Sequence, residues 1–143
     1  MSSRLYAAVL FGFAGCLVHP ALAETVKFHA VLAPGTEVPP VARAGSGTAD
    51  ATLNTETHKL SYDLTFSGFS GPVTMAHFHG PAKAGATGGV ALALGMNPVS
   101  PLHGEATLTA AQQADLLAGK WYANLHTAAN PKGAARGQML PAK

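Results

Sequence analysis

Alternation of apolar and polar side chains is the main signal along this chain. Between Leu60 and Phe66, the apolar residues occupy one side of an extended backbone, and Ser, Asp and Thr occupy the other. Weaker runs of the same kind are separated by Gly and Pro, which favour turns. The pattern predicts eight short strands, over residues 25–33, 47–53, 60–66, 72–79, 89–94, 104–108, 121–126 and 134–140.

One segment has the signature of a helix. Thr109 and Gln112 have the spacing of a capping box, and the following run to Ala118 is rich in Ala, Gln and Leu. Gly119 suits the C-terminal cap. The helix is expected to span about two and a half turns and to bridge two strands. Eight strands and one short helix predict an all-β fold, an antiparallel sandwich or barrel.

The first residues are typical of an export signal. A short positive start ending at Arg4 precedes an apolar stretch over residues 5–18, and Ala21-Leu22-Ala23 has the pattern of a cleavage site. The stretch is shorter than the ~20 residues of a membrane-spanning helix, so we predict a cleaved signal peptide over residues 1–23 and one domain over 24–143. The alternative is a lipoprotein signal, in which acylation of Cys16 tethers the domain to a membrane.

Composition narrows the chemistry that the domain can perform. The chain has 9 Lys+Arg against 7 Asp+Glu and no basic cluster, which gives nucleic-acid binding no support. Cys16 is the only cysteine, so residues 24–143 have no disulfide, thiolate ligand or Cys nucleophile. The acidic residues stand alone, and there is no phosphate-binding loop or dinucleotide fingerprint. Histidine is therefore the main reactive side chain.

The informative constellation is His77-Phe78-His79, on the predicted strand over 72–79. Residues i and i+2 of a strand point to the same side, about 6.6 Å apart, so the two imidazoles can converge on one ion. His126 lies on the polar side of the strand over 121–126, and His103 is a fourth candidate, expected in a loop. Nitrogen donors without thiolate suit Cu(II) or Zn(II), with a fourth position open to water.

Each of these residues also has a plain structural explanation. His77 and His79 could be polar residues on a solvent-facing side, and His126 could hydrogen-bond the turn that follows it. Met75 and Met96 are expected to fill the core or its rim. Because Met75 shares the strand face of His77, it nevertheless merits a test with Cu(I).

Short motifs follow one another along the chain in a specific order. They are Glu37-Val38-Pro39-Pro40-Val41, Ala76-His77-Phe78-His79-Gly80-Pro81-Ala82, Asn124-Leu125-His126-Thr127 and Arg136-Gly137-Gln138. In this order they resemble the CHRD domain family, the module named after chordin, over residues 26–140. The resemblance implies an immunoglobulin-like, Greek-key β-sandwich in an exported protein. In animals the module occurs in an extracellular antagonist of growth factors, and bacteria have single-domain members.

The layout of the histidines and Arg136 is similar to that of copper/zinc superoxide dismutase, in which histidines on a sandwich hold copper and an arginine steers the anion. This resemblance implies that Arg136 attracts a small anion to a metal at His77, His79 and His126. The structural alternative for Arg136 is a salt bridge or backbone hydrogen bonds that hold the last strand.

Two functions from different classes fit these observations. The first is a periplasmic protein that binds copper, with zinc as the alternative, for sequestration, delivery or redox chemistry such as superoxide dismutation. Because imidazoles must be neutral to bind metal, its affinity should fall as the pH drops through about 6.5. The second is a non-catalytic interaction module that holds a protein or glycan partner outside the cytoplasm. Neither function requires nucleic acid or a membrane span.

Overall fold

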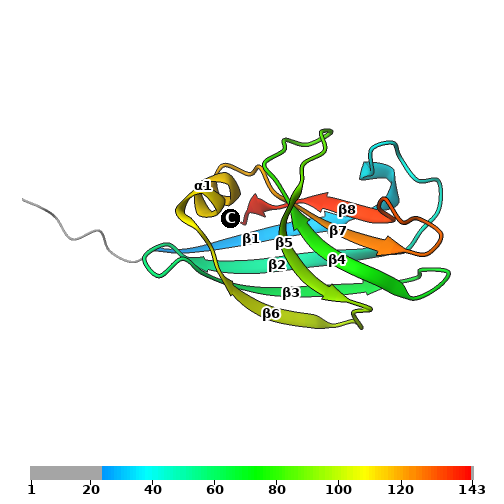
Figure 1. Ribbon diagram of the computed structural model, residues 1–143, viewed down its shortest axis with the longest axis horizontal. Helices are drawn as coiled ribbons and strands as arrows, with labels where there is room; N and C mark the ends of the chain where they lie inside the picture. The colour runs from blue at the N-terminus through cyan, green and yellow to red at the C-terminus, as the bar shows by residue number, and fades with distance from the viewer. Residues whose placement is uncertain (1–23, 143) are drawn as a thin grey trace, which may run out of the picture.

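Two antiparallel sheets form the protein in the computed structural model, which describes residues 24–142 (Figure 1). The first sheet has the order β6 (Leu102–Thr107), β3 (Lys59–Ser67), β2 (Ser46–Asn54), β1 (Thr25–Leu32) and β9 (Leu140–Pro141). The second has the order β5 (Val90–Met96), β4 (Val73–His79), β7 (Tyr122–Thr127) and β8 (Ala135–Gln138). The predicted signal peptide and Cys16 lie outside the described residues. None of the helices within 24–142 has the length and hydropathy to cross a membrane.

The predicted all-β sandwich is confirmed, and all eight expected strands are present. The expected strand over 134–140 is divided, because the chain changes sheets at Met139. Before that residue β8 pairs with β7, and after it β9 pairs with β1. The side chain of Met139 lies in the core between the sheets. Two open sheets are the result, rather than a closed barrel.

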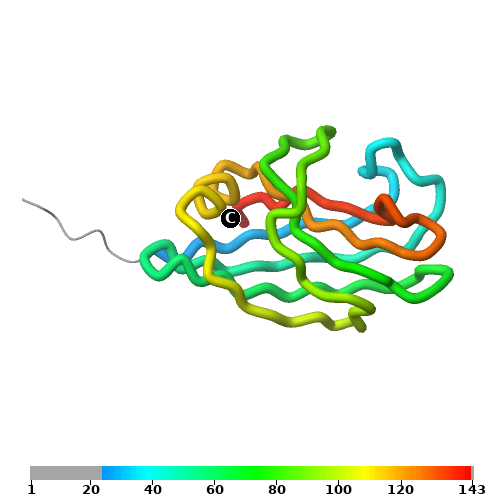
Figure 2. Tube along the Cα trace, viewed as in Figure 1, coloured from blue at the N-terminus to red at the C-terminus, as the bar shows by residue number. Residues whose placement is uncertain are grey.

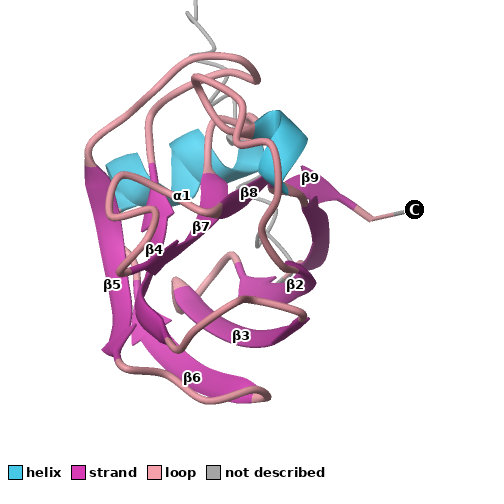
Figure 3. Ribbon diagram, turned by 90° about the vertical axis from the view of Figure 1, so that its right-hand side faces the viewer, coloured by secondary structure: helices cyan, strands magenta, loops and turns pink. Residues whose placement is uncertain are grey.

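The core lies between the two layers, which Figure 3 shows nearly end-on. Alternation supplies it: Phe28 from β1, Tyr62 from β3 and Phe78 from β4 point inward, where Trp121 joins them. The rings of Tyr62 and Phe78 meet edge to face at 5.7 Å, and those of Phe78 and Trp121 lie 5.8 Å apart. The alternate residues of β4 therefore point outward, and these include His77 and His79.

The predicted helix is confirmed as α1 (Ala110–Leu117), which connects β6 to β7. Its capping box is complete: the backbone N–H of Gln112 donates to the Thr109 hydroxyl at 3.2 Å, and the N–H of Thr109 donates to the Gln112 side chain at 2.8 Å. Gly119 follows with a φ of +68°, a conformation that favours glycine at a helix end. The buried side chain of Leu116 packs in the core and holds the helix against it.

Loops cover part of the outer face of the second sheet. They span residues 33–45, which include η1 (Pro34–Thr36), 80–89 and 128–134, and all are visible in the trace of Figure 2. The first and third lie together at one end of the sandwich, where they line a common pocket. Because β7 runs beneath this cover, all six of its residues are buried, on both faces. Of these six residues, the sequence pattern predicts burial only for Ala123 and Leu125, which face the core. Alternation along a strand does not show that loops pack on its outer face.

Candidate metal centre

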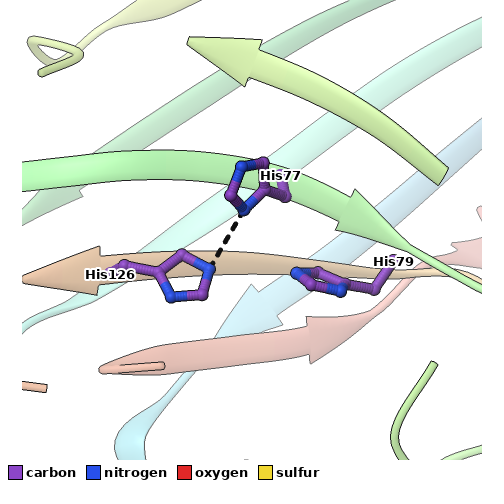
Figure 4. A group of neighbouring side chains, drawn as sticks. All are labelled: His77, His79 and His126. Atoms are coloured by element: carbon purple, nitrogen blue, oxygen red, sulfur yellow. Dashed lines mark hydrogen bonds between the residues drawn. The ribbon is translucent and has the colours of Figure 1, made fainter. Parts of the chain in front are cut away.

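Three histidines meet on the outer face of the second sheet, as Figure 4 shows. His77 and His79 point outward from β4, and His126 points outward from the neighbouring strand β7. One ring nitrogen of each lies within 4.8 Å of one ring nitrogen of both others. The cluster that the sequence predicts from His77, His79 and His126 is therefore formed, by segments almost 50 residues apart in the chain.

Backbone carbonyls from the covering loops orient two of the rings. Nδ1 of His79 lies 3.1 Å from the carbonyl oxygen of Gly88, and Nδ1 of His126 lies 3.1 Å from that of Pro131. A carbonyl oxygen only accepts, so in both rings Nδ1 carries the hydrogen. In the neutral imidazole this leaves a free lone pair on Nε2. An outer partner of this kind commonly fixes the tautomer of a metal-binding histidine.

The two Nε2 atoms have different surroundings. Nε2 of His126 lies 3.1 Å from Nδ1 of His77 and accepts its hydrogen when the cluster is neutral. Nε2 of His79 is buried and has no hydrogen-bond partner among residues 24–142. A buried polar atom without a partner costs free energy, commonly about 1–3 kcal/mol. An ion held by the cluster would give this nitrogen its missing partner.

The spacing of the nitrogens is close to that of a metal site. Two nitrogens that bind one Zn(II) ion at about 2.0–2.1 Å lie at most about 4.2 Å apart. The distance of 3.1 Å between Nδ1 of His77 and Nε2 of His126 is inside this limit. The ligand nitrogens of all three histidines lie within 4.8 Å of one another, a bound that is slightly larger than the limit. Small rotations of the side chains would close the difference. His77 would also have to move its hydrogen from Nδ1 to Nε2.

The electrostatics favour the neutral forms of His77 and His79. Burial lowers the pKa of His77 below its ordinary value, and the neighbouring His126 lowers it further. Burial also lowers the pKa of His79, although the hydrogen bond to Gly88 opposes this, and His77, His126 and Arg136 add to the lowering. Neutral imidazole is the form that binds metal ions. The surroundings therefore favour the ligand form over the protonated form.

Tyr122 fixes the plane of the His79 ring. The two rings stack at 4.9 Å with an angle of 4° between them. Arg136 approaches Tyr122 from β8, on the other side of β7, with Cζ 4.3 Å from the centre of the ring. The Tyr122 hydroxyl lies 3.3 Å from the backbone nitrogen of Gly88 and accepts from it. Tyr122 and Gly88 thus hold His79 from two directions.

A buried polar network adjoins the cluster. Nε of Arg136 donates to Glu37 at 2.9 Å, and Nδ2 of Asn124 donates to the other oxygen of Glu37 at 2.5 Å. Arg136 also donates to the carbonyl of Ala86 at 3.1 Å. A Cβ on Gly133 would lie 2.6 Å from the Glu37 carboxylate, so glycine is what permits this close approach. The network ties the loop over 33–45 to β7 and β8.

The remaining predicted residues lie outside the cluster or stabilise the fold. His103 is a residue of β6 in the first sheet, where its Nδ1 pairs with Asp63, so the structure does not bring it to the other histidines. Arg136 has the structural role given above as the alternative to anion steering, because it forms a salt bridge with Glu37 and donates to the backbone carbonyl of Ala86. The alternative for His126 is also observed, because its Nδ1 donates to the carbonyl of Pro131 in the turn that follows. The two roles are compatible, since the turn uses Nδ1 and the cluster uses Nε2, which faces His77.

The parts that support the cluster have little or no signal in the sequence. The carbonyls of Gly88 and Pro131 belong to the backbone and have no signature in residue type. The role of Glu37 is not apparent from the sequence either, although this residue begins the motif over 37–41. A lone acidic residue in a Pro-rich loop is a weak signal for an ion pair, since its partner Arg136 is 99 positions away.

Comparison with protein families identifies this architecture. The model of the CHRD domain matches residues 28–139. The chain belongs to the CHRD domain family. Searches of curated proteins and of solved structures find no match. In this CHRD domain the separate motifs meet in space, because Glu37, His77, His79, Asn124 and Arg136 all lie on or beside the outer face of the second sheet.

Proposed function

We propose that this CHRD domain binds a copper ion through His77, His79 and His126 and serves to sequester or deliver it. The observation that carries the proposal is the buried, unpartnered Nε2 of His79, which belongs to a set of ring nitrogens within 4.8 Å of one another. Carbonyls hold the opposite nitrogens of His79 and His126 as donors. Support thus comes from the ligands and from the atoms that orient them.

The donor set favours copper. The described residues include no cysteine, and the cluster has no carboxylate, so imidazole nitrogens are its only donors. At sites of this kind Cu(II) binds more tightly than Zn(II) among divalent ions. Zinc is the alternative, and a direct competition between the two ions distinguishes them.

Binding without catalysis is the role that the surroundings support. The guanidinium of Arg136 is engaged by Glu37, by the carbonyl of Ala86 and by the ring of Tyr122. A side chain held in this way has little freedom to steer an anion, so we do not extend the proposal to superoxide dismutation. His77 and His79 are only partly buried, which leaves a side from which an ion can exchange.

We further propose that the protein acts outside the cytoplasm. The apolar stretch over 5–18 with Ala21-Leu22-Ala23 supports export, as does membership in a family known from extracellular proteins. Mass spectrometry of the exported protein should find Glu24 at its N-terminus. A chain that begins at an acylated Cys16 would instead identify a lipoprotein.

Calorimetric titration with Cu(II) and with Zn(II) tests the central proposal. The protein should bind one ion per chain, with Cu(II) displacing Zn(II), and the double variant His77→Ala/His126→Ala should lose this binding. Electron paramagnetic resonance of the Cu(II) form should show coupling to nitrogen. If the protein binds neither ion, or if the double variant binds as tightly as the wild type, the proposal is wrong and an interaction module is the better account.

A further inference from the structure

Two methionines continue the row of residues that contains His126. In the second sheet Met75 of β4 lies directly opposite His126 of β7 on one side and Met96 of β5 on the other. Residues that are directly opposite in a sheet point to the same face, with Cβ atoms about 4.5–5.5 Å apart. Met96, Met75 and His126 therefore form one line across three strands, on the face that carries His77 and His79.

Packing explains the position of Met96 poorly. Its side chain is 71% exposed, whereas Met139 is 0% exposed in the core. The prediction that Met96 fills the core or its rim is therefore wrong. A single exposed apolar residue is ordinary by itself. The informative feature is that this exposed thioether lies beside a second one, which in turn lies beside a candidate metal ligand.

The backbone holds Met96 beside Met75. A register shift on β5 lies just before it, where Ala76 pairs with Gly95 but the next residue, His77, pairs with Ala93. Such bulges change the direction in which nearby side chains point. Just after Met96, the backbone N–H of Asn97 donates to the carbonyl of Thr74 at 2.8 Å. Met96 thus lies between a bulge and a backbone hydrogen bond, both of which join β5 to β4.

Thioether sulfur differs from imidazole in the ions that it prefers. Sulfur of this soft type selects Cu(I), whereas imidazole binds both copper and zinc. The methionine side chain is unbranched and flexible, so two neighbouring ones can turn toward a common ion. A pair of thioethers beside three imidazoles therefore offers Cu(I) two additional donors that Zn(II) does not favour.

We propose that Met75 and Met96 form a thioether site for Cu(I) at the exposed edge of the three-histidine cluster. This rests on the copper function proposed above and adds, beside the histidines, a site that prefers one oxidation state of copper. The ion would reach the exposed Met96 first and then pass by Met75 to the imidazoles. The step exchanges ligands only, because copper remains Cu(I) and no electron is transferred.

Competition for Cu(I) against a chromophoric chelator, under anaerobic conditions, tests the site. The variant Met75→Leu/Met96→Leu replaces both thioethers with apolar groups of similar volume. We expect its Cu(I) affinity to fall by about tenfold or more, while Zn(II) affinity stays within about twofold. Met139→Leu removes a buried methionine on the other side of the sheet and is the matched control, with wild-type affinity for both ions.

A spectroscopic test requires no variant. Ag(I) is a redox-inactive analogue of Cu(I), and the methyl groups of methionine can be labelled with carbon-13 for NMR. On addition of Ag(I) the methyl signals of Met75 and Met96 should shift, and that of Met139 should stay in place. Signals of Met75 and Met96 that do not move with Ag(I) would overturn the proposal.

The outcomes separate this inference from the metal site itself. Equal Cu(I) affinity in the wild type and the double methionine variant overturns the thioether site, even if the histidine variants lose Cu(II) and Zn(II). A parallel loss of Cu(I) and Zn(II) affinity in that variant also overturns it, because the methionines would then act on the histidines in general. Loss of Cu(I) alone supports it. The histidine proposal fails on its own test, when His77→Ala/His126→Ala keeps its Cu(II).

Discussion

Both sheets have histidines on their outer faces, but in different surroundings. On the first sheet, His29, Asp50, Asp63 and His103 lie opposite one another across β1, β2, β3 and β6. Each histidine there pairs through Nδ1 with its neighbouring aspartate, and all four side chains are exposed. On the second sheet, His77, His79 and His126 lie ring to ring beneath loops.

The comparison shows that the covering loops, more than the strands, create the candidate metal centre. Alternation places histidines on the outer face of either sheet. Among the described residues, only the second sheet has histidines whose Nδ1 donates to a loop carbonyl, in His79 and His126. The Nε2 atom of His79 is in addition buried without a partner. In the first sheet an aspartate beside each histidine provides a partner in water, where such a pair contributes little. The exposed histidines of the first sheet thus supply matched controls for the three-histidine cluster.

The largest contrast concerns the ion pairs of the two faces. The side chains of Glu37 and Arg136 are 3% and 8% exposed, so Glu37→Gln leaves a buried guanidinium without its counter-charge. We expect the free energy of unfolding to fall by about 3–5 kcal/mol. The control Asp50→Asn breaks the exposed pair with His29 and should cost about 0–1 kcal/mol. Urea denaturation measures both, and equal losses would contradict the assigned importance of the covering loop.

The next contrast concerns the ligands. Replacement of His77, His79 or His126 by Ala, one at a time, should weaken Cu(II) binding by more than about 100-fold, since each removes a ligand and not only an outer partner. His103→Ala and His29→Ala remove exposed histidines of the first sheet and should leave the affinity unchanged. Calorimetry with all five variants makes the comparison. Weakened binding in the His103→Ala variant would contradict the proposal, because it would place copper on the first sheet.

Metal binding should in turn stabilise the fold. At a free metal concentration of 100 times Kd, the free energy of unfolding should rise by about 2.7 kcal/mol, because the native site binds the ion and the unfolded chain binds it poorly. Thermal unfolding before and after addition of a chelator measures the effect. The rise should disappear in His126→Ala and persist in His103→Ala. A similar rise in both variants would indicate non-specific binding.

The smallest effect concerns pH. Since burial lowers the pKa of His77 and of His79, both should titrate below about 6.5 in the metal-free protein. Their contribution to stability is present above this pH and is lost as the pH falls through the lowered pKa values. Copper should likewise stay bound in weakly acidic solution, in which ordinary histidines are protonated. NMR titration of the ring protons provides the measurement, and midpoints above 6.5 would contradict it.

The sequence predicted the strands well, because alternation depends on local pattern alone. It placed His77 and His79 on one face of β4 and His126 on the outer face of β7. Whether β4 and β7 are neighbours is a matter of long-range pairing, which no local pattern reveals. The prediction of a three-histidine cluster was therefore conditional on that pairing, which the structure shows.

The position of His103 shows where local signals mislead. Pro101 and Gly104 beside it favoured a loop, but β6 begins at Leu102 and includes both His103 and Gly104. Pairing with β3 outweighs the turn propensity of these neighbours. The supporting carbonyls and the partners of Glu37 depend on how loops pack, which is decided by contacts between distant segments. These contacts are therefore visible only in the structure.

A crystal soaked with copper and measured at the copper absorption edge tests the central claim most directly. We predict one anomalous peak between the rings of His77, His79 and His126, with the Nε2 atoms of His79 and His126 about 2.0–2.1 Å from the ion. A peak at the row of His29 and His103 alone, or no peak on either face at saturating copper, would contradict the account.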